Sequence, residues 1–411
     1  MKSSLFSGVF VALTLGACAN HSDTLPDAPP VLENYATVLY AEYDDALTGA
    51  NALRTASTPL FSGTATQAAL DGARTAWRTA RVPYQQSEYA RFYDGPIDDP
   101  DMGNEEALLN SWPLDENTID YVMGMPSSGI INDASDYPII TESVIQDENA
   151  NRGEKNITTG YHAVEFLLWG QDFDPDGPGN RPFTDYVVGM GTNADRRRTY
   201  LDVATQLIID DLTQVRGEWA PSTAGTYRAT FVTLEPHIAL GRILLGMGKL
   251  TEGELAGQRI HTPFTTKDQE DEHSCFSDNT VADYTHDVQG LNNAYFGTYT
   301  RPDGTVVGDA SRSLSTLVHA RDAALDMRMR AALQAALTDI EAWPTVPSCP
   351  SHVLQGMCPF DQLITGTDAD PGRMAIQLVI NDLHTIATTL AEVATALGIN
   401  LQASNFQTDM R

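Results

Sequence analysis

Basic residues are scarce in this chain: 25 lysines and arginines stand against 55 aspartates and glutamates, which gives a formal net charge of -30. A surface with this charge repels nucleic acid and anionic lipid headgroups and concentrates cations. The composition therefore argues against nucleic acid as a partner and permits a cationic ligand or a metal ion. An acidic surface that serves mainly solubility explains the same charge and is the simpler interpretation.

Long apolar runs are also missing, apart from one short run near the N-terminus. Residues 5–15 are largely apolar, follow the single positive charge of Lys2, and are too few to span a bilayer as a helix. This pattern predicts a signal peptide over residues 1–17. Residues 15–18 resemble a bacterial lipobox, so we expect a lipid on Cys18, a polar tether over residues 18–30, and membrane attachment through the lipid anchor alone.

The residue after the cysteine bears on the location. Ala19 is not the Asp that commonly retains lipoproteins at the inner membrane. We therefore expect an outer-membrane lipoprotein of the bacterial cell envelope, facing the periplasm or the cell surface. A secreted protein with an unmodified Cys18 is the alternative.

Cysteines are few, with four in the whole chain. Three remain if Cys18 carries a lipid. In an oxidising envelope compartment we expect Cys349 and Cys358 to form a disulfide. Cys275 is then left over, and a buried, inert thiol is favoured there over a metal ligand or a reactive thiol.

Alternating patterns typical of strands are absent, whereas helical periodicity recurs along the chain. At 411 residues the chain exceeds what one hydrophobic core usually supports, so we predict two domains. The fold class is all-α, with one helical bundle over residues 31–220 and a second over residues 221–411. Their similar layout suggests an internal duplication. Helices are predicted at about 31–53, 64–91, 195–217, 223–248, 281–296, 310–342 and 372–397, and Pro83 is expected to kink or split the second of them.

The most informative stretch is a short apolar helix predicted at residues 158–170. His162 and Glu165 lie three residues apart in it, which places them on one helical face. A charged glutamate is costly to bury unless it is paired or coordinates a ligand. Gly160 leaves room for close approach of another backbone segment. The pair is either a structural hydrogen bond or half of a binding site, and the spacing alone does not decide between them.

A zinc peptidase is one use for such a pair. The usual helix motif of these enzymes needs a second histidine four residues after the first, and Phe166 stands there. Further ligands would have to come from distant segments. A metallopeptidase in which Glu165 activates water on a metal held partly by His162 stays as an alternative.

A second polar cluster lies at residues 267–279. Glu272, His273 and Asp278 could supply oxygen and nitrogen ligands to a metal. A solvated acidic loop that caps the next helix explains the same residues. Asp172 and its neighbours match the first half of an EF-hand loop, but Phe183 stands where the bidentate glutamate belongs, so weak or absent calcium binding is expected.

The helix also resembles a known family. Gly160, His162 and Glu165 match the GxHxxE motif of the imelysin family, in particular its iron-regulated branch. Other segments resemble that branch as well, and together they span most of the chain: residues 81–88, 111–115, 119–122, 166–172, 179–182, 271–279 and 292–295.

This resemblance implies an all-helical envelope protein associated with iron acquisition, with the motif near a cleft between two domains. We therefore expect iron or another divalent metal, or a metal-bearing ligand, to bind in that cleft, and envelope transport proteins as partners. The expected metal ligands are His162 and Glu165 from the first domain and Glu272, His273 and Asp278 from the second, with Gly160 and Asn279 lining the cleft. A protein-interaction module with a structural His-Glu pair is a third hypothesis.

Overall fold

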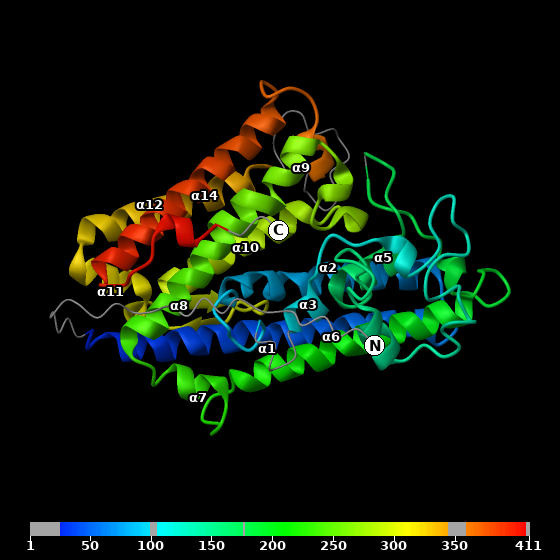
Figure 1. The fold of residues 1–411 in the computed structure, drawn as a ribbon, viewed down its shortest axis with the longest axis horizontal. Coiled ribbons are helices and arrows are strands. Elements are labelled where there is room, and N and C mark those ends of the chain that lie inside the picture. Colours follow the sequence, from blue (N-terminus) through cyan, green and yellow to red (C-terminus); the bar gives the residue numbers. More distant parts are fainter. Residues whose placement is uncertain (1–24, 99–104, 176, 344–358, 408–411) are drawn as a thin grey trace, which may run out of the picture.

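The computed structural model describes residues 25–98, 105–175, 177–343 and 359–407. It is built from helices, as predicted (Figure 1). The predicted signal peptide, the lipid on Cys18 and the disulfide between Cys349 and Cys358 lie outside the described residues. The expected tether ends earlier than residue 30, because Pro29 and Pro30 lie in the first turn of a helix that begins at Ala28.

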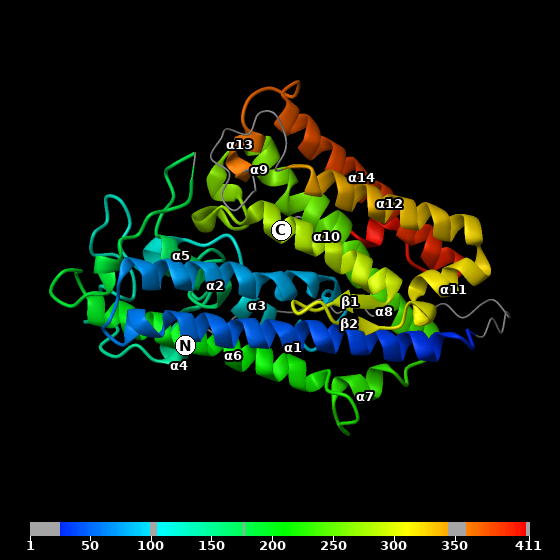
Figure 2. The ribbon, with the colours of Figure 1, turned by 180° about the vertical axis from the view of Figure 1, so that it is seen from behind.

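The first half of the chain is organised around three long helices. Helix α1 (Ala28–Phe61) packs against α2 (Gln67–Gln86) and α6 (Ala194–Glu218), and the three run side by side in both views (Figures 1 and 2). Helix α2 continues through Pro83, so the predicted split at that residue does not occur. The shorter elements of this half are α3 (Glu105–Leu109), α4 (Glu142–Glu148), α5 (Gly160–Trp169) and the 3-10 turns η1 (Glu88–Ala90), η2 (Glu116–Thr118) and η3 (Phe183–Tyr186).

The second half contains α7 to α14. Its two longest helices, α12 (Ala323–Glu341) and α14 (Pro371–Ala396), pack along each other, and α10 (Thr280–Phe296) packs against α2 of the first half. The helix predicted at residues 223–248 is divided before Pro236. The helix predicted at residues 310–342 is divided at Asp322, which caps α12. The remaining elements are α7 (Tyr227–Phe231), α8 (Pro236–Lys249), the π-helix η4 (Leu250–Arg259), α9 (His261–Thr266), η5 (Gln269–Asp271), η6 (Cys275–Ser277), η7 (Ala310–Arg312), α11 (Leu314–Arg321), α13 (Phe360–Ile364) and η9 (Ala403–Asn405).

One feature was not expected from the sequence. Strands β1 (Thr298–Thr300) and β2 (Val306–Gly308) form an antiparallel hairpin. Tyr299 packs with Val38 and Ala41 of α1. Strands of three residues are too short to produce a recognisable alternation, which is why the sequence pattern did not reveal them.

Buried apolar side chains connect the two halves. One continuous cluster of them extends from α1 to α14 and includes the fully buried Trp77, Trp169, Trp219 and Trp343. The boundary near residue 220 and the internal duplication stay predictions. Within the described ranges, every helix is too short or too polar to cross a membrane.

Candidate functional site

Helix α5 is buried along its whole length, from Gly160 to Trp169. Gly160 begins it with a φ of +81°, and a Cβ there would lie 2.4 Å from the carbonyl oxygen of Leu109 and 2.6 Å from that of Leu108. Only glycine allows this approach. The sequence prediction of close backbone approach at Gly160 agrees with this geometry, which fixes α5 against the end of α3.

His162 and Glu165 form a hydrogen-bonded pair that is fully buried. His162 Nδ1 lies 2.8 Å from Glu165 Oε2. The other oxygen, Oε1, accepts hydrogen bonds from the backbone N–H of Ser277 at 3.0 Å and from its hydroxyl at 2.6 Å. His162 Nε2 is buried and has no hydrogen-bond partner among the described residues. One donor or acceptor of this pair is therefore left unused in the protein interior.

His273 lies beside this pair. Its ring centroid is 4.8 Å from that of His162, and the two rings are tilted by 73°. Its Nδ1 lies 3.2 Å from Asp283 Oδ2. Asp283 also forms a buried ion pair of 2.8 Å with Arg81 of α2. Each of the two imidazoles thus has its Nδ1 on a buried carboxylate.

Burial dominates the charge states of these groups. It lowers the pKa of His162 well below its usual range, with a further contribution from the positive charge of Arg81. Burial and Arg259 lower the pKa of His273 to about 4. Burial raises the pKa of Glu165 to about 8, although the Ser277 hydroxyl opposes this rise. Both imidazoles are therefore neutral at neutral pH, which is the form that binds metals.

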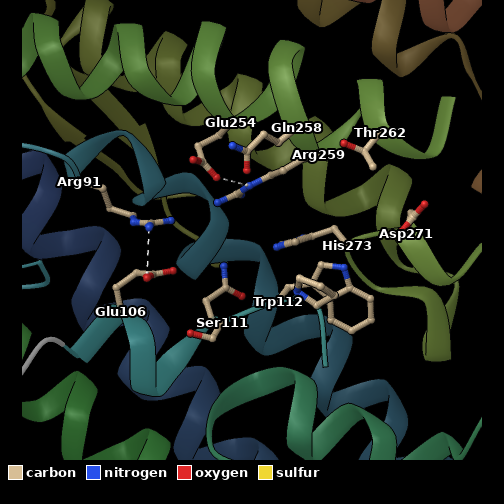
Figure 3. Close-up of a pocket in the computed structure, with 12 residues that line it drawn as sticks. Arg91, Glu106, Ser111, Trp112, Glu254, Gln258, Arg259, Thr262, Asp271 and His273 are labelled. Carbon is tan, nitrogen blue, oxygen red and sulfur yellow. Dashed lines mark hydrogen bonds and ion pairs between the residues drawn. The ribbon is translucent and has the colours of Figure 1, made fainter. Parts of the chain in front are cut away.

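A cavity of about 270 Å³ lies next to His273 and receives side chains from both halves (Figure 3). Arg91 and Glu106 of the first half form an ion pair of 3.1 Å, and Arg259 and Glu254 of the second half form one of 3.3 Å. Burial raises the pKa of Glu106 to about 7. The charges of Arg91 and Arg259 in the cavity wall are therefore largely balanced by carboxylates of the protein itself.

Trp112 links His162 to this cavity, which His162 itself does not line. Its ring centroid lies 5.0 Å from that of His162, and both Trp112 and His273 line the cavity. His162 thus lies one layer behind the cavity wall. A ligand in the cavity would reach His273 first.

The other predicted ligands lie in a different arrangement. Asp172, Asp278 and Asp361 are buried, and each offers a carboxylate oxygen within 4.8 Å of the others. Among the described residues, no other group of three potential metal ligands is this compact, and the predicted set of His162, Glu165, Glu272, His273 and Asp278 does not form one. Burial and the negative charge of Asp361 raise the pKa of Asp278 to about 9. The same two causes raise the pKa of Glu272 well above its usual range.

Several residues of the site were not found from the sequence. Ser277 lies within the polar cluster at residues 267–279 but was not singled out as a site residue, and its N–H and hydroxyl donate to Glu165. Asp283 has no motif around it, and Asp361 lies outside every pattern that was singled out. Asn279, predicted to line the cleft, donates from Nδ2 to Asp283 at 2.9 Å. Cys275 is a free, buried thiol whose pKa is raised by burial.

Known proteins resemble the chain in sequence and in fold. At 25% identity over 249 residues, it is similar to an iron-regulated protein A of Synechococcus elongatus, in a match that covers 61% of this chain and 58% of that protein. A crystal structure described as an iron-regulated protein A precursor from Parabacteroides distasonis matches with a TM-score of 0.67 at 20% identity, over 93% of this chain and 97% of the other.

An imelysin-like protein from Psychrobacter arcticum matches with a TM-score of 0.60 at 14% identity, over 93% of this chain and 98% of the other. These two likenesses establish the all-helical fold. The model of the imelysin family matches residues 39–390, which is most of the sequence. The chain therefore belongs to the imelysin family.

Proposed function

We propose that this chain binds a metal ion through His162 and His273 at the junction of its two halves. The observation that supports it most strongly is His162 Nε2, a fully buried nitrogen without a hydrogen-bond partner among the described residues. Leaving such a group unpaired is costly. A metal ion would satisfy it: with the imidazole proton on Nδ1, facing Glu165, the lone pair of Nε2 is available for coordination.

The surroundings of both imidazoles support the same proposal. Histidines that bind metals usually give their other ring nitrogen to a carboxylate, which fixes the tautomer and the ring orientation. Glu165 does this for His162 and Asp283 for His273. Because His162 and Ser277 occupy both oxygens of Glu165, its role in this arrangement is to orient the imidazole, not to bind the metal directly.

The metal is proposed to be iron. Imidazole suits iron, zinc, copper and nickel, so the side chains alone do not choose among them. The relatives from Synechococcus elongatus and Parabacteroides distasonis are named as iron-regulated proteins, which favours iron. Arg91 and Arg259 in the cavity wall are already paired with carboxylates, and this favours a metal ion over an anionic metal chelate.

Equilibrium binding tests the proposal. Chelator-stripped protein is dialysed against Fe²⁺ without oxygen, and bound iron is measured by ICP-MS. We expect His162→Ala to lose one equivalent of tightly bound iron. His384→Ala is the matched control, since His384 also has its Nδ1 on a carboxylate, that of Glu252 at 2.7 Å, but is half-exposed. Equal iron content in wild type and His162→Ala would contradict the proposal.

A metallopeptidase is less well supported. It needs Glu165 to activate a water molecule, yet this side chain is fully buried and its oxygens accept hydrogen bonds from Ser277 and contact His162. We therefore expect no chelator-sensitive cleavage of a peptide library. Cleavage that Glu165→Gln abolishes while the fold is retained would favour the enzyme instead.

We further propose that the protein acts in the bacterial cell envelope, attached to the outer membrane by a lipid on Cys18. The lipobox-like residues 15–18 support this. Palmitate labelling in cells tests it: wild type should incorporate the label and Cys18→Ala should not. Label in neither protein, with both secreted in soluble form, would argue for an ordinary signal peptide.

A further inference from the structure

Three buried aspartates from distant parts of the chain lie close together. Asp172 follows α5, Asp278 follows η6, and Asp361 lies in the first turn of α13. Their side chains offer carboxylate oxygens within 4.8 Å of one another, and the three residues are 2%, 8% and 4% exposed. We call these three residues the carboxylate cluster.

Two of the three aspartates lack an ion pair that would balance their negative charge. Within the described ranges neither Asp172 nor Asp278 forms an ion pair with a basic side chain. The positive charge of Arg78 acts on Asp278, but its Nη2 donates to the carbonyl oxygen of Ser277 at 2.6 Å. Buried carboxylates this close need bound protons or a cation between them.

Orphaned oxygen atoms point to a ligand independently of the cluster's charge. Asp278 Oδ2 is buried and accepts no hydrogen bond from a described residue. Both oxygens of Glu272, which is 1% exposed, also lack a hydrogen bond of good geometry, although the Thr280 hydroxyl lies near enough to oppose the rise of its pKa. After burial itself, the charges of Asp361 and Asp278 act most strongly on Glu272, which locates it next to the cluster. A fourth carboxylate is therefore available there.

The segments that carry the cluster are tied to one another. The carbonyl oxygen of Asp172 accepts a hydrogen bond from the Gln269 amide at 2.8 Å, and the Gly179 N–H donates to the carbonyl oxygen of Phe276 at 3.0 Å. The Gln362 amide donates to the carbonyl oxygen of Pro175. The loop after α5 is thus held against both segments that supply the other aspartates, so the oxygens are arranged before any ligand binds.

We propose that Asp172, Asp278 and Asp361, with Glu272, bind one hard, oxygen-preferring divalent cation of the Ca²⁺ and Mn²⁺ class. Calcium lies about 2.3–2.6 Å from its oxygen ligands, so a separation of up to 4.8 Å between two of them suits a central ion. This site takes Glu272 and Asp278 out of the ligand set of the histidine site. It does not depend on whether His162 and His273 bind a metal.

Calorimetric titration of the chelator-stripped full chain with Ca²⁺ and, separately, Mn²⁺ tests the site. Wild type should bind one equivalent, and Asp278→Asn and Asp361→Asn should bind at least tenfold more weakly. Asparagine tolerates the left-handed backbone of Asp278, whose φ is 54°. Asp147→Asn, which removes an exposed carboxylate of α4, controls for unspecific binding to the acidic surface and should bind like wild type. In the Ca²⁺ titration His162→Ala should bind like wild type, because calcium takes oxygen ligands and not imidazole.

Thermal melting guards against variants that fail to fold. Without metal, Asp278→Asn should melt at or above the wild-type temperature, because the substitution removes repulsion between carboxylates. Calcium should raise the melting temperature of wild type and not that of Asp278→Asn. The proposal is overturned if wild type shows no saturable binding of either ion, which would mean that the cluster holds protons, or if Asp278→Asn and Asp361→Asn bind as tightly as wild type.

Discussion

Glu165 is a buried carboxyl group that is hydrogen-bonded to His162 and Ser277. Its two oxygens are occupied by His162 and by the Ser277 N–H and hydroxyl, and no arginine or lysine forms an ion pair with it among the described residues. Burial consequently raises its pKa to about 8. At neutral pH Glu165 is therefore mostly protonated in the metal-free chain. A cation on His162 Nε2 would displace that proton, and the carboxylate would then accept from the His162 Nδ1–H and orient the ring, which is the role we propose for it.

Replacing the Glu165 carboxyl group by an amide tests this role. Glu165→Gln should weaken metal binding about 10- to 100-fold without abolishing it, as expected for a residue that orients a ligand. His162→Ala should abolish binding at the same site. Titration with Co²⁺, followed by its visible absorption, measures both. A loss as complete in Glu165→Gln as in His162→Ala would mean that Glu165 binds the metal itself.

The buried imidazole of His273 makes the stability of the fold depend on pH. The pKa of His273 is about 4 in the folded chain and about 6.5 when unfolded. Between these values the unfolded chain binds a proton that the folded chain does not, so this residue lowers the free energy of unfolding as the pH falls from 6.5 to 4, by at most about 1.4 kcal/mol per pH unit. His273→Gln should therefore lose less stability than wild type over this range. Parallel stability curves from urea unfolding would contradict it.

At the scale of single elements, α5 depends on its first residue. Gly160→Ala places a Cβ against the carbonyl oxygens of Leu108 and Leu109 and requires a positive φ, so it should cost more than about 2 kcal/mol. Gly72→Ala is the control, because this glycine lies exposed within α2 with open space around it, and the change should stabilise by up to about 1 kcal/mol. Chemical denaturation measures both, and similar effects of the two would refute the prediction.

The helices were largely predictable because each carries its own apolar periodicity. Helix α6 begins and ends within a residue or two of the prediction, and α10 and α14 are similarly close. The π-helix η4 was missed, since the predicted helix stopped at residue 248. Its continuation depends on packing against α8 and α14, which the local sequence does not express.

The site was only half predictable. The spacing of His162 and Glu165 places both on one face of α5, as expected, because a helix fixes relations between residues three apart. The other buried groups of the site come from segments more than 100 residues after that helix: Ser277, Asp283 and Asp361. Such pairs follow from how α2, α5, α10 and α13 pack, and no local pattern contains that information.

At the scale of the whole molecule, buried ion pairs join the two halves. Arg81 of α2 lies 2.8 Å from Asp283 of α10, and both side chains are 1% exposed. Arg81→Met should cost about 3–5 kcal/mol, because it leaves Asp283 buried without its main cation. Arg328→Met, which breaks a half-exposed pair with Glu392, should cost less than about 1 kcal/mol. Equal losses of stability in the two variants, measured by thermal unfolding, would show that the buried pair between the halves stabilises the fold no more than an exposed pair does.

The central claim is that His162 Nε2 is a metal ligand at the junction of the halves. Anomalous diffraction from crystals of the full chain soaked in Fe²⁺ without oxygen, recorded at the iron edge, tests it most directly. We expect an iron peak about 2.1 Å from His162 Nε2 that also contacts His273, and no peak at that position in His162→Ala. Iron bound elsewhere only, or His162 Nε2 hydrogen-bonded to a water molecule with no metal nearby, would contradict it.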